Sequence, residues 1–423
     1  MSQPRGLPMF TEYNRAFLAA QRAAPDHAMA ARGADQLLDD LGIAFRSLPY
    51  YFRIDPATHA TLVRATRTLV DAQEKLVRHL CTTRTPDELR ALFNVPPKMA
   101  AQMDWPTVAS RGLRMLRADI IPTDSGYYFC EINHFSGVGA TEGYYSAYAL
   151  AELLGRSVVG VSPIRQQAHL YMAECRRGGF TRFVILDSTK HRAYGFSPHW
   201  LLQRYLRLMA PDIEIHYHDE LTYPSEWLAP AEAGKTLIHR LVTVEDTSDE
   251  GEFLVALRDS GATFSDLFEG ELKMHRRWFS MLCDPEYQKI LSEEERQVVQ
   301  QYVPHTFDLS SATLESALAD KDRLVFKRSY TYGGKEVLIG DRYSSEELRA
   351  LLSVDVSGWN CQRRLHTSSL ELPGPDGELV PYHYVLGMYL YGEGASGLLV
   401  RGTAHSPVVN LSQGGGVSWA FVE

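Results

Sequence analysis

Cysteine is scarce in this 423-residue sequence, and long apolar runs are missing. The five cysteines are widely scattered and form no CxxC pair, which argues against a disulfide framework and against a zinc site. No window approaches the roughly 18 apolar residues that a membrane-spanning helix needs. The N-terminal residues also lack the basic start and apolar stretch of a signal peptide. These absences predict a soluble protein of the cytoplasm.

An excess of positive charge is missing as well. The chain has 43 basic and 52 acidic residues, a net charge of −9 with neutral histidines. Such a chain has no field that would attract nucleic acid or an anionic membrane surface, so neither partner is expected. Hydrophobic residues make up 45% and charged residues 22%, which is typical of a globular protein and excludes a disordered one. At about 150 residues per domain the length favours two or three compact units, and it leaves a homodimer open.

Residues 1–112 are predicted to form a helical N-terminal region. Asp55 and Thr85 are each followed by proline, which is typical of an N-cap before the first helical residue, and Pro96-Pro97 ends the second helix. After Asp55, leucine and valine recur every seven residues and form an apolar stripe. Because only about three heptads are present, the stripe favours core packing over an oligomerisation seam.

Three further regions follow. Residues 113–156 are expected to form a hairpin of two extended segments and then a short helix. Residues 157–245 alternate apolar strands with helices, including one near 198–209, and this predicts a small βαβ layer. Residues 246–423 begin as helix and become rich in strands and glycine, with one helix at 344–352. The sequence therefore predicts an α/β, or α+β, fold.

The hairpin carries a candidate metal site. Glu131 and Asn133 are two residues apart, so on a strand their side chains point to the same face. If residues 124–126 form a three-residue loop with its glycine in the left-handed conformation, Asp119 lies opposite Glu131. Three hard oxygen ligands on one face suit magnesium. The alternative is a solvated polar face on which Arg117 neutralises an acid.

A second candidate site is the segment RLVFKRSYTYGGKEVLIG. Lys327 ends an expected strand, and Gly333 and Gly334 allow a turn whose backbone amides approach phosphate oxygens. Lys335 lies just beyond this turn. The segment is not a Walker A motif, and taken alone it is better explained as a β-hairpin with two surface lysines.

The C-terminal stretch adds a third group. Arg401 lies on an expected strand, Asn410 ends the next one, and the glycines at 414–416 follow. Arginine suits charge stabilisation on a phosphoryl group during transfer. The glycines alone are equally compatible with a mobile terminal loop.

Taken together, these motifs resemble those of ATP-grasp ligases, in which a lysine strand, a glycine loop, a hinge strand, an arginine strand and an N-x-x-x-GG segment follow one another. The acidic ligand and the E-x-N pair usually come last, whereas here they precede the other motifs, near residue 119. This is the order of the circularly permuted ATP-grasp group, to which the synthetase domain of glutathionylspermidine synthetase is similar. The resemblance covers about residues 113–423. It implies an ATP-grasp fold with a small pre-ATP-grasp-like layer.

The resemblance also implies roles for individual residues, with ATP and Mg²⁺ as the cofactors. The implied magnesium ligands are Asp119, Glu131 and Asn133. The implied contacts to ATP are Lys273, Lys327, Gly333, Gly334, Lys335 and, near the adenine, Gln362. Arg401 and Arg117 would act on the transferring group and on an acyl phosphate. The sequence has Arg328 where the family often has proline after the strand lysine.

The expected function is ADP-forming ligation of a carboxylate to an amine through an acyl phosphate. The substrates would be small molecules, for example amino acids or peptides. Two alternatives stay open: a non-catalytic ATP-grasp-like protein that binds nucleotide or acts as a scaffold, and a phosphotransferase that stops after phosphorylation. Residues 188–200 are one candidate for the substrate pocket, and a turn with a helix cap explains them equally well.

Overall fold

The computed structural model describes residues 46–48, 52–95, 115–139, 162–189, 199–242, 252–265, 269–330, 336–373, 379–404 and 415–422, and the single residues 100, 103, 105, 108, 144 and 409. Several predicted features lie outside these residues. They are most of the expected helix at 142–154, the glycine loop with Gly333, Gly334 and Lys335, and residues 410–414 with Asn410. Among the helices within the described ranges, none has the length and hydrophobicity to cross a bilayer.

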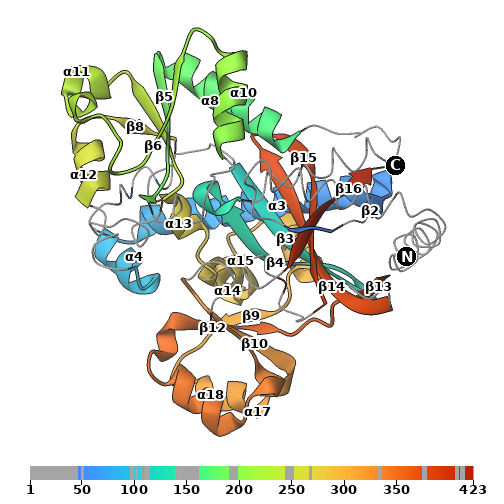
Figure 1. Cartoon of the computed structure of the whole chain (residues 1–423). Helices are drawn as coiled ribbons and strands as arrows, with labels where there is room; N and C mark the ends of the chain where they lie inside the picture. The colour runs from blue at the N-terminus through green and yellow to red at the C-terminus, as the bar shows by residue number, and fades with distance from the viewer. Residues whose placement is uncertain are drawn as a thin grey trace, which may run out of the picture.

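A large mixed sheet forms the centre of the molecule (Figure 1). Its main path runs β1-β16-β15-β14-β3-β4, with β13 paired to β14 and β2 paired to β16. The strands are β1 (Arg46–Ser47), β2 (Phe52–Ile54), β3 (Met115–Thr123), β4 (Gly126–His134), β13 (Ser369–Pro373), β14 (Leu379–Tyr391), β15 (Gly394–Thr403) and β16 (Gly416–Val422). Because β3 pairs with β14, the hairpin lies beside the C-terminal strands. The sequence did not predict β1 and β2, and its helical assignment is wrong for these two segments.

The long helix α3 (Pro56–Thr83) covers one face of this sheet. It begins where the sequence predicted, because the Asp55 side chain accepts a hydrogen bond from the Thr58 backbone N–H at 2.9 Å. Most of the leucines and valines of the predicted stripe are buried, and they join one hydrophobic cluster with strand residues such as Ile120 and Leu386. Core packing of the stripe is therefore confirmed.

The hairpin β3–β4 has the predicted register for a different reason. Asp119 lies opposite Glu131, as expected. The loop contains two residues instead of three, since Thr123 pairs with Gly126, and this alone would shift the register by one. A β-bulge at residue 130 restores it, because the pairing jumps between Asp119 and its neighbour in β3. The three-residue loop was thus a wrong prediction, and the bulge was not foreseen.

A four-stranded parallel sheet in the order β6-β5-β7-β8 forms a second layer, at the upper left of Figure 1. It consists of β5 (Arg182–Leu186), β6 (Glu214–His218), β7 (Thr236–Arg240) and β8 (Thr263–Phe264), with helices α8 (Pro163–Gly178), α10 (His199–Met209), α11 (Pro230–Ala233) and α12 (Glu252–Asp259). The predicted strands at β5, β6 and β7 and the helix near 198–209 are confirmed. The short strand β8, in a stretch expected to be helical, was missed.

A small antiparallel sheet in the order β11-β10-β12-β9 lies below the large one in Figure 1. Its strands are β9 (Thr306–Asp308), β10 (Leu324–Arg328), β11 (Val337–Ile339) and β12 (Trp359–Arg363), and α17 (Leu314–Ala319) and α18 (Ser345–Leu352) cover one face. The predicted hairpin around the glycine loop corresponds to β10 and β11. The helix expected at 344–352 is confirmed as α18, and a capping box starts it at Ser344.

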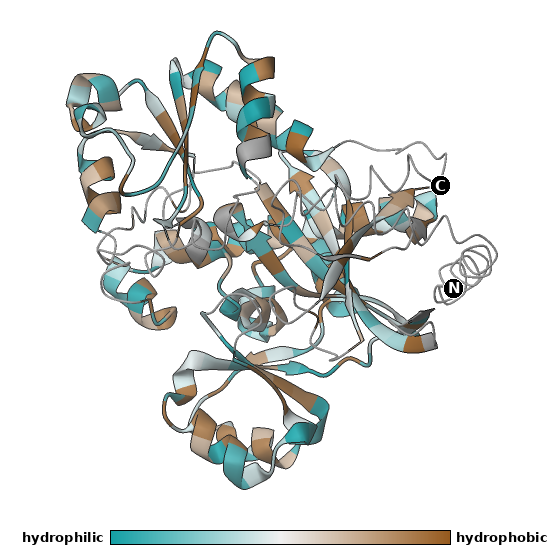
Figure 2. Cartoon of the chain, in the orientation of Figure 1, coloured by the Kyte–Doolittle hydropathy of each residue, from teal (hydrophilic) through white to brown (hydrophobic). Residues whose placement is uncertain are grey.

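Shorter elements connect these three sheets. They are α4 (Pro86–Leu92), α13 (Glu269–Lys273), α14 (Arg277–Cys283), α15 (Pro285–Gln288), α16 (Glu293–Tyr302) and 3-10 turns at Phe135–Gly137, Ser225–Leu228, Lys321–Arg323, Gly340–Arg342 and Val356–Gly358. Hydrophobic residues, brown in Figure 2, are concentrated in the strands and on the helix faces that contact them. The core is therefore built from sheets covered by helices.

Candidate active site

The charged residues of the hairpin lie on the face of the large sheet that points away from α3. Leu116, Ala118 and Ile120 of β3 pack into the cluster with α3. Because side chains alternate along a strand, Arg117 and Asp119 point to the other face. Both are nonetheless almost completely buried, with exposed fractions of 6% and 1%.

Asp119 is the centre of this group. Its Oδ1 lies 2.8 Å from Arg117 Nε, and its Oδ2 lies 2.6 Å from Arg401 Nη2. A third residue, Asn133, donates a hydrogen bond from Nδ2 to Asp119 Oδ2 at 3.1 Å. Four residues that the sequence singled out, on β3, β4 and β15, are thus brought together.

The charge state of Asp119 follows from these contacts. Burial opposes its negative charge, but Arg117 and Arg401 more than compensate, so the pKa of this carboxyl lies well below its usual range. The pKa of Arg117 is raised in turn: burial acts against its charge, but Asp119 and further anionic groups outweigh it. Asp119 is therefore an ionised carboxylate at any ordinary pH.

A glycine on the intervening strand makes room for this arrangement. Gly387 of β14 lies directly opposite Asp119 in the sheet, and Arg401 of β15 reaches Asp119 across it. A Cβ atom at Gly387 would lie 2.7 Å from Arg117 Cδ, closer than such atoms can approach. Arg117 also donates from Nη1 to the carbonyl of Gly139 at 3.3 Å. The position of Arg117 depends on the missing side chain at Gly387.

The small sheet supplies a lysine from the opposite side. Lys327 Nζ donates to Gln362 Oε1 at 2.7 Å and to the carbonyl of Cys130 at 3.4 Å, so it links β10 with β12 and with the bulge of β4. Gln362 in turn donates to Thr306 Oγ1 at 3.1 Å. Burial lowers the pKa of Lys327, and anionic neighbours such as Glu131 partly offset this. Lys327 and Gln362, predicted separately, are neighbours.

Arg276 is a functional candidate that the sequence analysis missed. Its Nη2 lies 3.4 Å from Glu131 Oε2, and its Nη1 donates to the Arg328 carbonyl at 2.6 Å. It follows Lys273 by three residues in the segment ELKMHRRW, where only the lysine was noticed. The signal was present, because two adjacent arginines, three and four residues after a predicted ATP contact, stand at the start of the largely apolar helix α14.

The remaining predicted residues are placed differently. Lys273, at the end of α13, is 5% exposed, and its charge acts on His134 and Cys81 on the side of α3. Cys130 is the half-buried bulge residue beside Lys327. Burial raises the pKa of its thiol to about 12, so it is not a thiolate nucleophile.

Asp119, Glu131 and Asn133 carry oxygen donors of the kind that a hard divalent cation prefers. Asp119, Glu131 and Asn133 share one face, and Asp119 is held in the ionised state that a metal ligand requires. Within the described ranges, no group of three or more His, Cys, Asp or Glu side chains lies at metal-binding distance, so the amide of Asn133 would have to be the third ligand. Mg²⁺ commonly keeps only one or two carboxylates and completes its shell with water and phosphate oxygens.

The surroundings carry more positive than negative charge. Among the described residues whose contacts are given above, Arg117, Arg401, Arg276 and Lys327 stand beside Asp119 and Glu131, four positive charges to two negative ones. A cavity of about 160 Å³ is lined by residues that include His275, Arg277 and Arg328–Tyr330, the first two of which are the sequence neighbours of Arg276. Such a region suits a ligand with several negative charges.

One solved structure places this fold among known proteins. A glutathione synthetase-like effector from Globodera pallida, in its apo form, superposes with a TM-score of 0.59 at 10% sequence identity, over 89% of this chain and 90% of the other. No protein-family model matches the sequence, and no curated protein matches it significantly. At 10% identity the likeness is one of fold, and it supports an ATP-grasp-like architecture for this chain.

Proposed function

We propose that this chain is an ATP-dependent ligase of the circularly permuted ATP-grasp group, which joins a carboxylate to an amine and releases ADP. The observation that carries the proposal is the buried cluster Arg117–Asp119–Arg401, with Lys327 facing it from the small sheet. Burying charged groups is costly even when they are paired, so a buried charge cluster is a candidate functional site. Because the fold is ATP-grasp-like, we infer that the nucleotide binds between the large sheet and the small sheet.

The excess of positive charge is the basis for binding ATP. Lys327 would neutralise the phosphates, and Gln362, at the next strand, would lie near the adenine. The family resemblance further implies ATP contacts by Lys273, Gly333, Gly334 and Lys335, of which Lys273 lies on the side of α3 and the other three lie outside the described residues. Mg²⁺, held by Asp119, Glu131 and Asn133, would supply further charge neutralisation on the phosphate oxygens.

The proposed reaction has two steps. A carboxylate oxygen of the first substrate attacks the γ-phosphorus of ATP, the bond to the bridging oxygen breaks, and ADP leaves. The amine then attacks the acyl carbon, phosphate leaves and the amine loses a proton, which gives the amide or peptide bond. Arg401 would stabilise the phosphoryl group in transfer, and Arg117 the acyl phosphate, because preorganised guanidinium groups act where charge develops.

The proposal extends to partners and location. The substrates are a small carboxylate and a small amine, with amino acids and peptides as the first candidates. We propose that neither nucleic acid nor a membrane surface is a partner and that the reaction takes place in the cytoplasm. A homodimer stays open.

A substrate screen tests the proposal. The full chain is incubated with ATP, Mg²⁺ and pairs of carboxylates and amines, and ADP release is followed together with the masses of the products. We expect ADP and a product whose mass equals the two substrates minus water. A stable phosphorylated product without condensation would favour the phosphotransferase, and ATP binding without ADP release would favour the non-catalytic protein. If the chain neither binds ATP nor turns it over, the assignment is refuted.

A further inference from the structure

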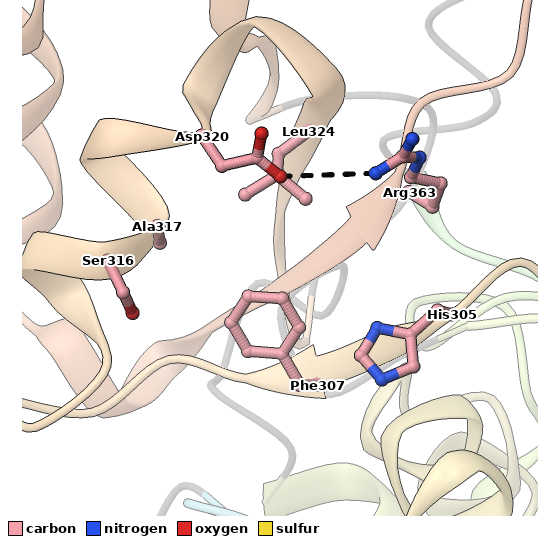
Figure 3. A pocket seen from close by; sticks show the side chains of 7 residues that line it. All are labelled: His305, Phe307, Ser316, Ala317, Asp320, Leu324 and Arg363. Carbon is pink, nitrogen blue, oxygen red and sulfur yellow. Dashed lines mark ion pairs between the residues drawn. The ribbon is translucent and has the colours of Figure 1, made fainter.

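A second, larger cavity lies on the far side of the small sheet from the candidate active site. It has a volume of about 410 Å³ and lies between α17 and the strands β9, β10 and β12 (Figure 3). Leu324 of β10 lies opposite Arg363 of β12, and the next cross-strand pair is Val325 with Gln362. Because side chains alternate, this cavity and the Lys327–Gln362 pair are on opposite faces of the same sheet.

One half of the cavity is apolar. Phe307, Ala317 and Leu324 contribute to its wall, and the Phe307 ring is half-buried. The His305 ring lies beside Phe307, with ring centroids 5.9 Å apart. Figure 3 shows both rings on the same side of the cavity, away from the charged residues. This half suits an aliphatic or aromatic group.

The other half carries a loosely formed ion pair. Arg363 Nη1 lies 3.9 Å from Asp320 Oδ2, and the two side chains are 51% and 49% exposed. Arg323 approaches the same carboxylate from outside the cavity at 3.8 Å. Exposed pairs at such distances contribute little to stability, so Arg363 and Asp320 can turn towards a ligand at small cost.

We propose that this cavity binds a free α-amino acid with an apolar side chain. The carboxylate and the ammonium group of an α-amino acid are attached to one carbon, so they can engage the adjacent Arg363 and Asp320 at the same time. The apolar side chain would then enter the half lined by Phe307 and Leu324. The volume of about 410 Å³ is sufficient for the largest natural side chains.

The site is independent of the proposed reaction. Its residues do not include the Arg117–Asp119–Arg401 cluster, and an occupant would lie behind Gln362 instead of beside it. A ligand in the cavity can still affect the position of Gln362, because the cavity residue Arg363 follows Gln362 in β12. In addition, Thr306, which accepts the hydrogen bond from Gln362, is adjacent to the cavity residue Phe307. The proposal therefore goes beyond the ligase assignment.

Calorimetric titration of the full chain with L-phenylalanine and L-leucine tests the site. We expect saturable binding of both. N-acetyl-L-phenylalanine, which lacks the ammonium group, and L-phenylalaninamide, which lacks the carboxylate, should bind about tenfold more weakly, because each loses one ionic partner. These comparisons use the unchanged protein, so they do not depend on the folding of a variant. Absence of saturable binding, or equal binding of phenylalanine and its two derivatives, would overturn the proposal.

Variants then locate the bound amino acid. Arg363→Gln should weaken phenylalanine binding about tenfold, and so should Ser316→Tyr, which fills the cavity from α17. Arg349→Gln is the matched control, since Arg349 is similarly exposed on α18 and pairs with Glu315 outside the cavity. Glu131→Gln should bind phenylalanine normally. Loss of binding in Glu131→Gln with full binding in Arg363→Gln would place the amino acid in the candidate active site and refute the second site.

Discussion

Arg401 on β15 contacts Asp119 on β3 across an entire intervening strand, with Nη2 and Oδ2 2.6 Å apart. This contact joins the hairpin β3–β4 to a C-terminal strand of the same sheet. Both side chains are mostly or fully buried, at 11% and 1% exposure. The pair is therefore part of the core as well as of the proposed chemistry, and the two roles have to be separated by experiment.

Asp119 and Glu131 should respond differently to loss of charge. Asp119→Asn leaves two buried arginines without their counter-ion, so we expect the free energy of unfolding to fall by about 3 kcal/mol or more. Glu131→Gln, at 28% side-chain exposure, should cost about 1 kcal/mol or less. If the carboxylates of Asp119 and Glu131 bind magnesium, both variants should lose ATP-dependent turnover. Urea unfolding and ADP release measure the two effects separately. Near-native turnover of both variants would contradict the metal assignment.

Lys327→Met should weaken ATP binding by between about tenfold and a hundredfold, the range expected when one hydrogen bond to a charged group is lost. The loss should be larger than for Lys289→Met, because Lys289 is an exposed lysine whose ion pair is with Glu286. Calorimetry with ATP measures both. If the two variants bind ATP with equal affinity, Lys327 is a lysine of the hairpin that does not contact ATP.

The sequence predicted the components of the candidate site better than their connections. Asp119 opposite Glu131 follows from strand alternation and turn chemistry, yet the register depends on a bulge at residue 130, which has no marker such as glycine in the sequence. The pairing of Lys327 with Gln362 follows from β10 lying next to β12, a tertiary choice that no local pattern specifies. The strands β1 and β2 are only two and three residues long, and they exist because they add to the edge of β16.

The stability of the protein should decrease between neutral pH and pH 5, partly because of His134. Burial, together with the charge of Lys273, lowers the pKa of His134 to about 3 from an ordinary value of 6.5. Below pH 6.5 His134 of the unfolded chain takes up a proton that the folded chain does not take up. The free energy of unfolding therefore decreases as the pH is lowered from about 6.5 to about 3. From pH 7 to pH 5 this amounts to about 2 kcal/mol for one such histidine.

His134→Gln isolates this contribution. The variant should lose about 2 kcal/mol less than the wild type between pH 7 and pH 5, whatever its stability at pH 7. Urea unfolding at several pH values gives the difference. His275, whose pKa burial also lowers to about 3, remains in the variant and preserves part of the slope. An unchanged slope in His134→Gln would mean that His134 is accessible to protons in the folded state.

Gly387→Ala tests whether the missing side chain on β14 positions Arg117. The added Cβ would lie 2.7 Å from Arg117 Cδ, and Arg117 cannot yield freely because Asp119 holds its Nε at 2.8 Å. We expect a loss of about 1–3 kcal/mol in unfolding free energy, the usual cost of overpacking, and a larger fall in turnover than in ATP affinity. Gly402→Ala on β15 is the control, because its Cβ would meet the end of the Leu48 side chain at 3.1 Å, a contact that a small rotation relieves. If both variants unfold and turn over alike, Arg117 is not held in place by the contact with β14, and its role in the reaction would have to be reassigned.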